Sequence, residues 1–380
     1  MSERLEQAKQ RKEKLLSILN EFSLHSAQND EESRFPIENI TLLKKIDYPA
    51  YNVATEFQGG GALLSEWLEY QMLIAKQDGA TALAIGWHMG LMEQLREHNN
   101  WHQDMYELVI QDVVENGALI NAAQTEAATG SPTRGGMPAT HARKEGDNWV
   151  INGHKTFTTM APVLDYFLVS ATITEDEKVA NFLIHKNAKG LRIEETWDMV
   201  AMRATASHDL IFEHVQVPLE ACLETVQRGK AAGWLLHIPA CYLGIAKAAH
   251  EYAIDYAKSY SPNSIKSTIS ELPNVRAKIG EAELLIRQSE SYLFDVAKKW
   301  EMADESNRQL LKTDLGAVKY VVVNHAHKIV DLAMRIVGAH SLRMDVPLQR
   351  YYRDVRAGLH NPPMDDMTIQ SLALEALSSK

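Results

Sequence analysis

Cysteine is scarce in this sequence, because 380 residues include only Cys222 and Cys241. Two cysteines cannot build the disulfide framework of a small secreted domain, so a reducing compartment, the cytoplasm, is expected. Metal-binding spacings are missing as well, since neither Cys-x-x-Cys nor His-Glu-x-x-His occurs. The glycines at 59–61 lack the preceding strand and following helix of a dinucleotide fingerprint, which argues against a Rossmann fold.

Excess positive charge is also missing. Lys and Arg number 39 against 50 Asp and Glu, which gives a formal net charge of -11. Nucleic acids and anionic membranes select basic surfaces, so neither is expected as a partner. The longest apolar runs, near 320–323 and 234–246, are too short or too interrupted to span a bilayer. The charged residues 1–9 do not resemble a signal peptide, which again favours a cytoplasmic protein.

Hydrophobic periodicity divides the chain into helical, strand-rich and helical parts. The polar stretch 25–36 is expected to be a loop. Helical spacing of apolar residues predicts helices over 4–24, 62–98 with a break at Asp78-Gly79, 103–118, 231–260, 272–303, 306–338 and 364–378. Strands are predicted where β-branched and aromatic residues gather, at 149–153, 156–159, 166–170, 180–185 and 209–212. The predicted fold class is α+β: an N-terminal α-helical domain over 1–120, a central antiparallel β-barrel or sandwich over 121–225, and a C-terminal four-helix bundle over 226–380.

Within this layout, four motifs resemble those of the acyl-CoA dehydrogenase superfamily. Gln124–Ser131 is similar to that family's Thr-Glu-Pro-Gly-Ala-Gly-Ser loop, and Gly146–Thr159 to its strand that borders the flavin ring. The segment from Met202 to Pro218 looks like the end of its β-domain. Val337–Arg356 looks like part of its C-terminal bundle. Each motif alone is weak, but their order within an α-β-α chain is specific, and the resemblance covers nearly the whole sequence.

The resemblance implies a flavin-dependent oxidoreductase with FAD held between the β-domain and the C-terminal helices. Carried over residue by residue, it predicts the following cofactor-binding residues: Gln124, Thr125, Ser131, Phe157, Thr159, Arg335 and Gly338. Hydroxyls and neighbouring backbone groups suit flavin edge atoms and phosphate, and a phenylalanine ring can lie against the isoalloxazine. The same residue types are also ordinary in strands and turns, so the residues alone leave both interpretations open.

The resemblance also implies partners. The expected substrate is a small molecule, such as an acyl-CoA. Family members commonly form tetramers or dimers in which a neighbouring subunit completes the site, so a homo-oligomer, for instance a homotetramer, is expected. A flavin reductase or an electron-transfer flavoprotein is a further possible partner.

Two departures from the family pattern affect chemistry and cofactor. Dehydrogenation needs a carboxylate base. The family usually places this base, a Glu, in one of two regions. In this chain those regions are residues 356–364 and 233–236, and neither contains a Glu. Asp365 and Asp366 are the nearest carboxylates and resemble residues that cap a helix N-terminus. The family resemblance also leads one to expect two contacts to the adenosine half of FAD, one from residues 258–262 and one from residues 335–339. The side chains that make these contacts in the family are absent from both ranges of this chain. FMN or loosely held reduced flavin therefore stands beside FAD as an alternative.

Two histidines point to oxygen chemistry. Flavin-dependent monooxygenases of the same fold place histidines in the regions of His88 and His360, and an imidazole is suited to proton delivery near neutral pH. We therefore predict His88 and His360 as the catalytic residues, the alternative being that both are structural. Three functions remain open: an acyl-CoA dehydrogenase-like enzyme, a two-component monooxygenase that uses reduced flavin, and a non-catalytic flavin-binding or scaffold protein.

Overall fold

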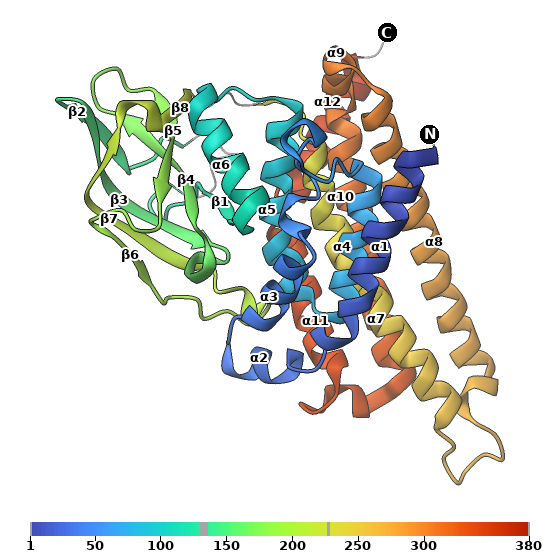
Figure 1. The fold of residues 1–380 in the computed structure, drawn as a ribbon. Coiled ribbons are helices and arrows are strands. Elements are labelled where there is room, and N and C mark those ends of the chain that lie inside the picture. The colour runs from blue at the N-terminus through green and yellow to red at the C-terminus, as the bar shows by residue number, and fades with distance from the viewer. Residues whose placement is uncertain (1, 130–135, 226–228, 379–380) are drawn as a thin grey trace.

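The computed structural model describes residues 2–129, 136–225 and 229–378. A β-sheet region lies beside a stack of long helices, to which both ends of the chain contribute (Figure 1). The N-terminal helices are α1 (Ser2–Phe22), α2 (Ser26–Glu32), α3 (Ile37–Lys45), α4 (Leu64–Gln77), α5 (Gly79–Glu97) and α6 (Gln103–Asn116). The predicted break between α4 and α5 is confirmed, because Asp78 caps α5 by accepting a hydrogen bond from the Thr81 N–H at 2.7 Å.

The prediction of a loop over residues 25–36 was wrong, because α2 lies there. The helix is short and polar, so its apolar periodicity is too weak to reveal it. A tertiary contact holds it instead: the Ser26 hydroxyl is buried and lies 2.6 Å from Oδ2 of Asp78. This contact ties α2 to the junction of α4 and α5.

The sheet is formed by β1 (Ile120–Ala123), β2 (His141–Glu145), β3 (Asn148–Thr158), β4 (Tyr166–Ile173), β5 (Val179–His185), β6 (Leu191–Glu194), β7 (His208–Pro218) and β8 (Cys222–Thr225). The strand order is β6-β7-β3-β2-β4-β5-β8, and β1 pairs with β4. The pairing is mixed, since β1 and β2 both run parallel to β4 while the other neighbours are antiparallel. The strands predicted at 149–153 and 156–159 are one strand, β3, whose register against β7 shifts near Gly153.

Strand β4 shows how the sheet joins the helices. Successive side chains of a strand point to opposite faces. Phe167 and Val169 accordingly belong to the main core, whereas Tyr166 and Leu168 pack in a second cluster with residues of α6. Both faces of β4 are therefore covered, and the sheet is fixed against the N-terminal helices.

The C-terminal part begins with the 3-10 turn η7 (Gly233–Leu236) and continues as α7 (His237–Ser259), α8 (Pro273–Met302), α9 (Glu305–Arg308), α10 (Lys312–Val337), α11 (Pro347–Ala357) and α12 (Asp365–Ser378). Helix α7 is buried along 236–246, as its nearly continuous apolar sequence predicts. A Cβ on Gly244 would lie 2.5 Å from the carbonyl oxygen of Met72, so α4 and α7 are in backbone contact there. The α+β fold is confirmed, while the domain boundaries at 120/121 and 225/226 stay predictions.

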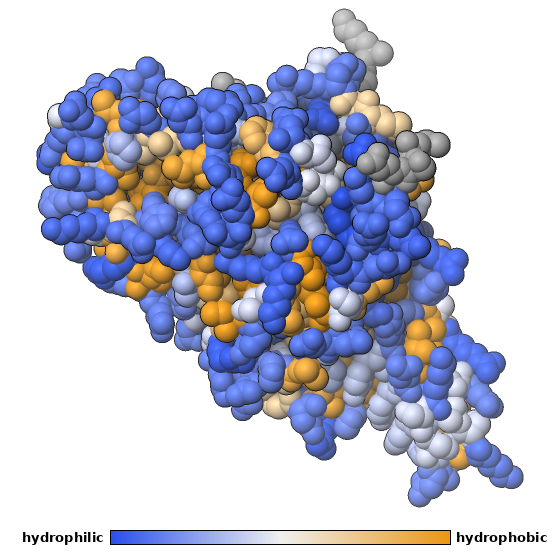
Figure 2. Space-filling view, in the orientation of Figure 1, coloured by the Kyte–Doolittle hydropathy of each residue, from blue (hydrophilic) through white to orange (hydrophobic). Residues whose placement is uncertain are grey.

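Across the described residues, no helix is long and apolar enough to cross a membrane. Figure 2 shows hydrophilic side chains over most of one face, with apolar side chains gathered over the sheet and in parts of the helical stack.

Candidate functional site

Two of the segments predicted to bind the cofactor lie side by side. The Thr156 N–H donates to the Thr125 carbonyl at 2.9 Å, which joins the Gln124-Thr125 segment to β3. The side chains of Gln124 and Thr125 are half-buried, and Gln124 Nε2 donates to Asn181 Oδ1 at 3.2 Å. Ser131 lies outside the described residues. The structure thus brings Gln124 and Thr125 next to the strand that carries Phe157.

A buried ion pair anchors this segment. The Lys155 ammonium lies 2.6 Å from Oε1 of Glu126, and the two side chains are 0% and 3% exposed. Glu126 also accepts hydrogen bonds from the N–H groups of Ala139 (2.6 Å) and Thr140 (3.1 Å). Lys155 Nζ further contacts the Ser170 hydroxyl at 3.1 Å. One carboxylate thereby holds the segment before β2 against the segment that contains Thr125.

The pKa shifts of the pair follow from burial and pairing. Burial disfavours the charged form of Glu126, but the bonds from Lys155 and Thr140 outweigh it and lower its pKa. Burial lowers the pKa of Lys155, and the Glu126 carboxylate opposes that change. Neither residue was predicted as a site residue from the sequence, although both lie within the motifs that carry the family resemblance.

Phe157 presents an aromatic ring to solvent at the end of β3. Its side chain is 52% exposed, and its φ of 60° is uncommon for a residue with a side chain. The ring lies edge-on to Trp197, with centroids 5.8 Å apart. An exposed aromatic ring on a strained backbone is typical of a ligand site.

Several hydroxyl groups are carried by the residues next to Phe157 in the sequence and by the turn before β7. The Thr159 hydroxyl is 2.9 Å from that of Ser207, which is 2.8 Å from that of Thr205. The hydroxyls of Thr156 and Thr158 are buried and have no hydrogen-bond partner among the described residues. The exposed ring of Phe157 and the half-buried Thr125, whose segment pairs with Thr156, fit a planar flavin ring with a hydrogen-bonding edge.

The turn before β7 connects the sheet to the helices. The Met202 N–H donates to Oδ1 of Asp354 on α11 at 2.7 Å. The neighbouring Arg353 binds the Asp30 carboxylate of α2 and also donates to the Val200 carbonyl at 2.8 Å. Burial raises the pKa of Asp354 to about 7, although the Met202 N–H opposes this. Residues 200–202 are therefore held between α2 and α11.

The loop between α11 and α12 contains no carboxylate before Asp365. His360 is exposed, and its neighbour Asn361 accepts a hydrogen bond from the buried Tyr242 hydroxyl at 2.5 Å. Asp365 lies in the first turn of α12, where Lys319 and Asn324 each contact its carboxylate at 3.1 Å. Its carboxylate is already bound, which disfavours it as a catalytic base.

The catalytic role predicted for His88 does not agree with its surroundings. The ring is completely buried in α5 and both nitrogens have partners: Nδ1 accepts from the Ile120 N–H at 3.1 Å, and Nε2 lies 3.0 Å from the Pro49 carbonyl oxygen. Burial lowers the pKa of His88 to about 4. A neutral imidazole with both nitrogens bonded connects α5 to β1 and to the 3-10 turn η1 (Tyr48–Ala50), which supports the structural alternative for His88.

Arg335 and Gly338 lie at the end of α10. Arg335 is exposed and paired with Asp331 at 2.8 Å. Gly338 ends the helix with a φ of 72°, which glycine adopts without strain. Among the described residues, no hydrogen bond or ion pair links either of them to β3. Their predicted cofactor contacts stay a prediction.

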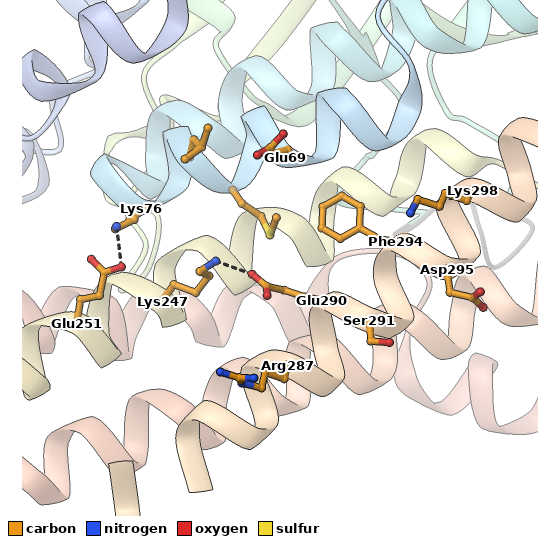
Figure 3. Close-up of a pocket in the computed structure, with 12 residues that line it drawn as sticks. Glu69, Lys76, Lys247, Glu251, Arg287, Glu290, Ser291, Phe294, Asp295 and Lys298 are labelled. Atoms are coloured by element: carbon orange, nitrogen blue, oxygen red, sulfur yellow. Dashed lines mark hydrogen bonds and ion pairs between the residues drawn. The ribbon is translucent and has the colours of Figure 1, made fainter. Parts of the chain in front are cut away.

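Two hollows in the described part of the chain lie elsewhere. A groove of about 720 Å³ runs between α4, α7 and α8, and its charged residues form pairs such as Lys76–Glu251 at 2.7 Å (Figure 3). A cavity of about 340 Å³ is lined by residues at the start of α4, at the ends of α5 and α8, and in α9: Leu63, Leu64, Glu93, Arg96, Glu97, Glu301 and Arg308. Neither hollow contains a residue that the sequence predicted for the site.

Comparison with known proteins gives the family. Residues 121–215 match the model "Acyl-CoA dehydrogenase, middle domain", and residues 236–361 match "Acyl-CoA dehydrogenase, C-terminal domain". The chain is 49% identical, over 98% of both sequences, to YdbM of Bacillus subtilis (strain 168), which is provisionally named an acyl-CoA dehydrogenase. The chain therefore belongs to the acyl-CoA dehydrogenase family, whose members are flavoprotein oxidoreductases.

Two solved structures share the fold. Butyryl-CoA dehydrogenase from Megasphaera elsdenii superposes with a TM-score of 0.85 at 19% identity, over 97% of this chain and 98% of that one. The dibenzothiophene monooxygenase TdsC from Paenibacillus sp. A11-2, in a complex with FMN and indole, gives a TM-score of 0.85 at 21% identity, over 95% of each chain. The fold is thus common to proteins of different activity, and the reaction has to be argued from the site.

Proposed function

We propose that this protein is a two-component monooxygenase, which uses reduced flavin and oxygen to oxidise a small organic substrate. The observation that carries the proposal is the state of the carboxylates in and after the α11–α12 loop. The α11–α12 loop has none before Asp365, and Asp365 is bound by Lys319 and Asn324. Proton abstraction from an acyl-CoA needs a free carboxylate in that place, whereas oxygen chemistry does not.

The flavin, when bound, supplies the redox chemistry, and the residues of the chain would hold it. Phe157 would lie against the ring, and the half-buried Thr125 would meet its polar edge. Arg335 and Gly338 would lie toward the phosphate end, in this chain or in a neighbouring subunit of a homo-oligomer. Because two contacts for the adenosine half are absent from the sequence, FMN is proposed over FAD.

His360 is the proposed proton donor. It is exposed on the loop that replaces the usual carboxylate, while the Tyr242–Asn361 hydrogen bond holds the next residue of that loop in place. Histidine is the side chain that most often transfers protons in catalysis. This proposal keeps the sequence-based role of His360 and gives up that of His88.

Flavin titration and oxygen uptake test the proposal. The protein should bind FMN with micromolar or lower Kd and bind FAD more weakly. With FMN, a flavin reductase and NADH, His360→Ala should lose at least tenfold in substrate-dependent oxygen uptake while its Kd for FMN is unchanged. His340→Ala, which changes another exposed histidine, is the control. No flavin binding would support the scaffold alternative, and equal oxygen uptake by both variants would remove His360 from the reaction.

A second candidate is an acyl-CoA dehydrogenase that passes electrons to an electron-transfer flavoprotein. The 49% identity to YdbM favours it. In that case Asp365 would be the nearest base, and Asp365→Asn would abolish reduction of the flavin by an acyl-CoA. Under the proposal above, Asp365 takes no part in the reaction and only binds Lys319 and Asn324, so the same variant leaves oxygen uptake per folded molecule within about twofold.

A further inference from the structure

A turn between β6 and β7 connects the candidate flavin site to the C-terminal helices. The turn contains the 3-10 helix η5 (Arg203–Thr205), and both flanking residues have positive φ: Met202 has a φ of 51° and Ala206 a φ of 44°. Residues with side chains seldom adopt this left-handed conformation, which persists only where the surrounding structure holds it. Contacts with other elements must therefore fix the shape of the turn.

One buried carboxylate supplies such a contact. Asp354 of α11 is 5% exposed, and its Oδ1 accepts the Met202 N–H at 2.7 Å. Within the described ranges of the chain, this is its only hydrogen bond and no ion pair reaches it. Burying a carboxylate without a cation costs free energy, so an apolar side chain of similar size would serve stability better. The bond to the turn is the observation that accounts for an aspartate at this position.

Met202 extends this contact to the candidate flavin site in two directions. Its carbonyl oxygen accepts a hydrogen bond from Trp197 Nε1 at 2.9 Å and another from the Thr205 hydroxyl at 3.0 Å. The ring of Trp197 lies edge-on to that of Phe157. The Thr205 hydroxyl continues, through one further hydroxyl, to that of Thr159. Both candidate flavin residues of this part of the sheet are thus connected to one backbone position in the turn.

A second set of contacts holds the turn independently of Asp354. Arg353 of α11 donates to the Val200 carbonyl at 2.8 Å and pairs with the Asp30 carboxylate of α2. Arg203 donates to the backbone carbonyl of the same Asp30 at 2.7 Å. The turn therefore stays between α2 and α11 when Asp354 is replaced, and the replacement changes its local shape.

We propose that Asp354 is a positioning residue, which acts through Met202 to orient the Phe157 ring and thereby determines the affinity for flavin. Asp354 lies in the C-terminal segment that carries the family resemblance, but the sequence gave no role to it. The inference rests on the proposed function, because it takes Phe157 and Thr159 as residues that contact the flavin.

FMN titration of three variants tests the role of the carboxylate. Asp354→Ala should bind FMN at least about tenfold more weakly, because the Met202 N–H loses a charged acceptor. Asp354→Asn should stay within about threefold of the wild type, since an amide oxygen can accept the same N–H. Glu301→Ala is the matched control and should not change the Kd. The Glu301 carboxylate of α8 also accepts a backbone N–H, that of Ser65 on α4 at 2.6 Å, away from the sheet.

A double variant tests whether the effect passes through Met202. Trp197→Phe keeps an aromatic ring and removes the N–H that binds the Met202 carbonyl, so it should weaken FMN binding about threefold or more. Combined with Asp354→Ala, it should weaken binding by clearly less than the product of the two single effects, because both changes act on the same turn. If Asp354→Ala does not fold, Trp197→Phe and the pH measurement on Asp354→Asn decide.

The pH dependence of riboflavin binding separates positioning from a general loss of stability. Burial raises the pKa of Asp354 to about 7, and a neutral acid accepts a hydrogen bond more weakly than a carboxylate. The Kd of the wild type for riboflavin, which has no phosphate to titrate, should therefore rise about threefold or more as the pH falls from about 8 to about 6. Asp354→Asn should show no such rise.

Other ionisable groups face Asp354 from α11, α2 and α7. They are Arg350, Tyr351, Arg353, Asp30, Cys241 and Tyr242. Burial raises the pKa of Cys241 and of Tyr242 well above their ordinary values, so neither group titrates between pH 6 and pH 8. Comparison of the wild type with Asp354→Asn cancels what the remaining groups contribute.

The outcomes distinguish this inference from the proposed function. An unchanged FMN affinity in Asp354→Ala, or an equal loss in Glu301→Ala, overturns the positioning role, and so does the same pH dependence in the wild type and Asp354→Asn. As long as the wild type binds FMN, these results leave the proposed function in place. A wild type that binds neither FMN nor riboflavin rejects the proposed function, and the positioning role with it.

Discussion

Replacing Lys155 with Met tests whether the buried ion pair positions the flavin-binding segment. The change leaves the Glu126 carboxylate, which is 3% exposed, without its cation. Removing one partner of a buried pair costs about 3–5 kcal/mol. Two backbone N–H groups still bind Glu126, so we expect the lower end, about 3 kcal/mol of unfolding free energy, which is a large part of the stability of a typical domain.

The assay combines chemical denaturation with FMN titration. Lys155→Met should lose about 3 kcal/mol and bind FMN about tenfold more weakly, because Thr125 is held to β3 next to that pair. Adding Glu126→Gln should recover part of the stability, since it removes the unpaired charge. Lys186→Met, which breaks an exposed pair with Asp165, is the control and should cost at most about 1 kcal/mol. The reasoning is refuted if the two Lys variants are equally stable, or if FMN affinity does not respond to Lys155→Met.

Three further predictions concern buried groups. Asp354→Asn should stabilise the protein at pH 8 by about 1 kcal/mol or more and hardly at all at pH 4, as measured by urea denaturation. The pKa of Asp354 is about 7 in the folded protein and lower in the unfolded chain, so the wild type loses stability as the pH rises between these two values. His88→Leu should cost about 2–4 kcal/mol in the same assay, because it leaves the Ile120 N–H and the Pro49 carbonyl unbonded, while oxygen uptake per folded molecule stays unchanged. Burial lowers the pKa of His237 to about 3, so between pH 7 and pH 5 acid protonates this ring only in the unfolded chain and thereby destabilises the wild type. His237→Leu removes this effect, so the variant should lose about 2 kcal/mol less stability than the wild type between pH 7 and pH 5. Identical acid titrations of both proteins would contradict the last of these.

Periodicity was a sound guide to the helices, because burial of an apolar face determines them. The pattern over 62–98 predicted both α4 and α5 and their break at Asp78, where a side-chain cap starts the second helix. Helix α2 was missed because its stability comes from Ser26 reaching Asp78, a contact between residues far apart in sequence. The parallel pairing of β1 with β4 was missed for the same reason, since no local pattern encodes a partner strand.

The candidate site could be proposed from the sequence only where motifs carried it. The resemblance brought Gln124, Thr125 and Phe157 to notice, and the structure places their segments side by side. The position of His88 in a motif-like region suggested catalysis, but only the fold reveals that both of its nitrogens are bonded. The opposite holds for His237, whose unbonded nitrogens have no signal in the sequence.

Anaerobic mixing with an acyl-CoA tests the central claim most directly. The protein, loaded with oxidised flavin, is mixed without oxygen with butyryl-CoA and with longer and branched acyl-CoAs, and the visible absorbance of the flavin is followed. Because no free carboxylate lies in the loop that contains His360, we expect the flavin absorbance to persist. The same protein, given a flavin reductase, NADH and oxygen, should consume oxygen when a flat, uncharged ring compound is added. Rapid bleaching of the flavin by any acyl-CoA would contradict the account and identify the protein as an acyl-CoA dehydrogenase.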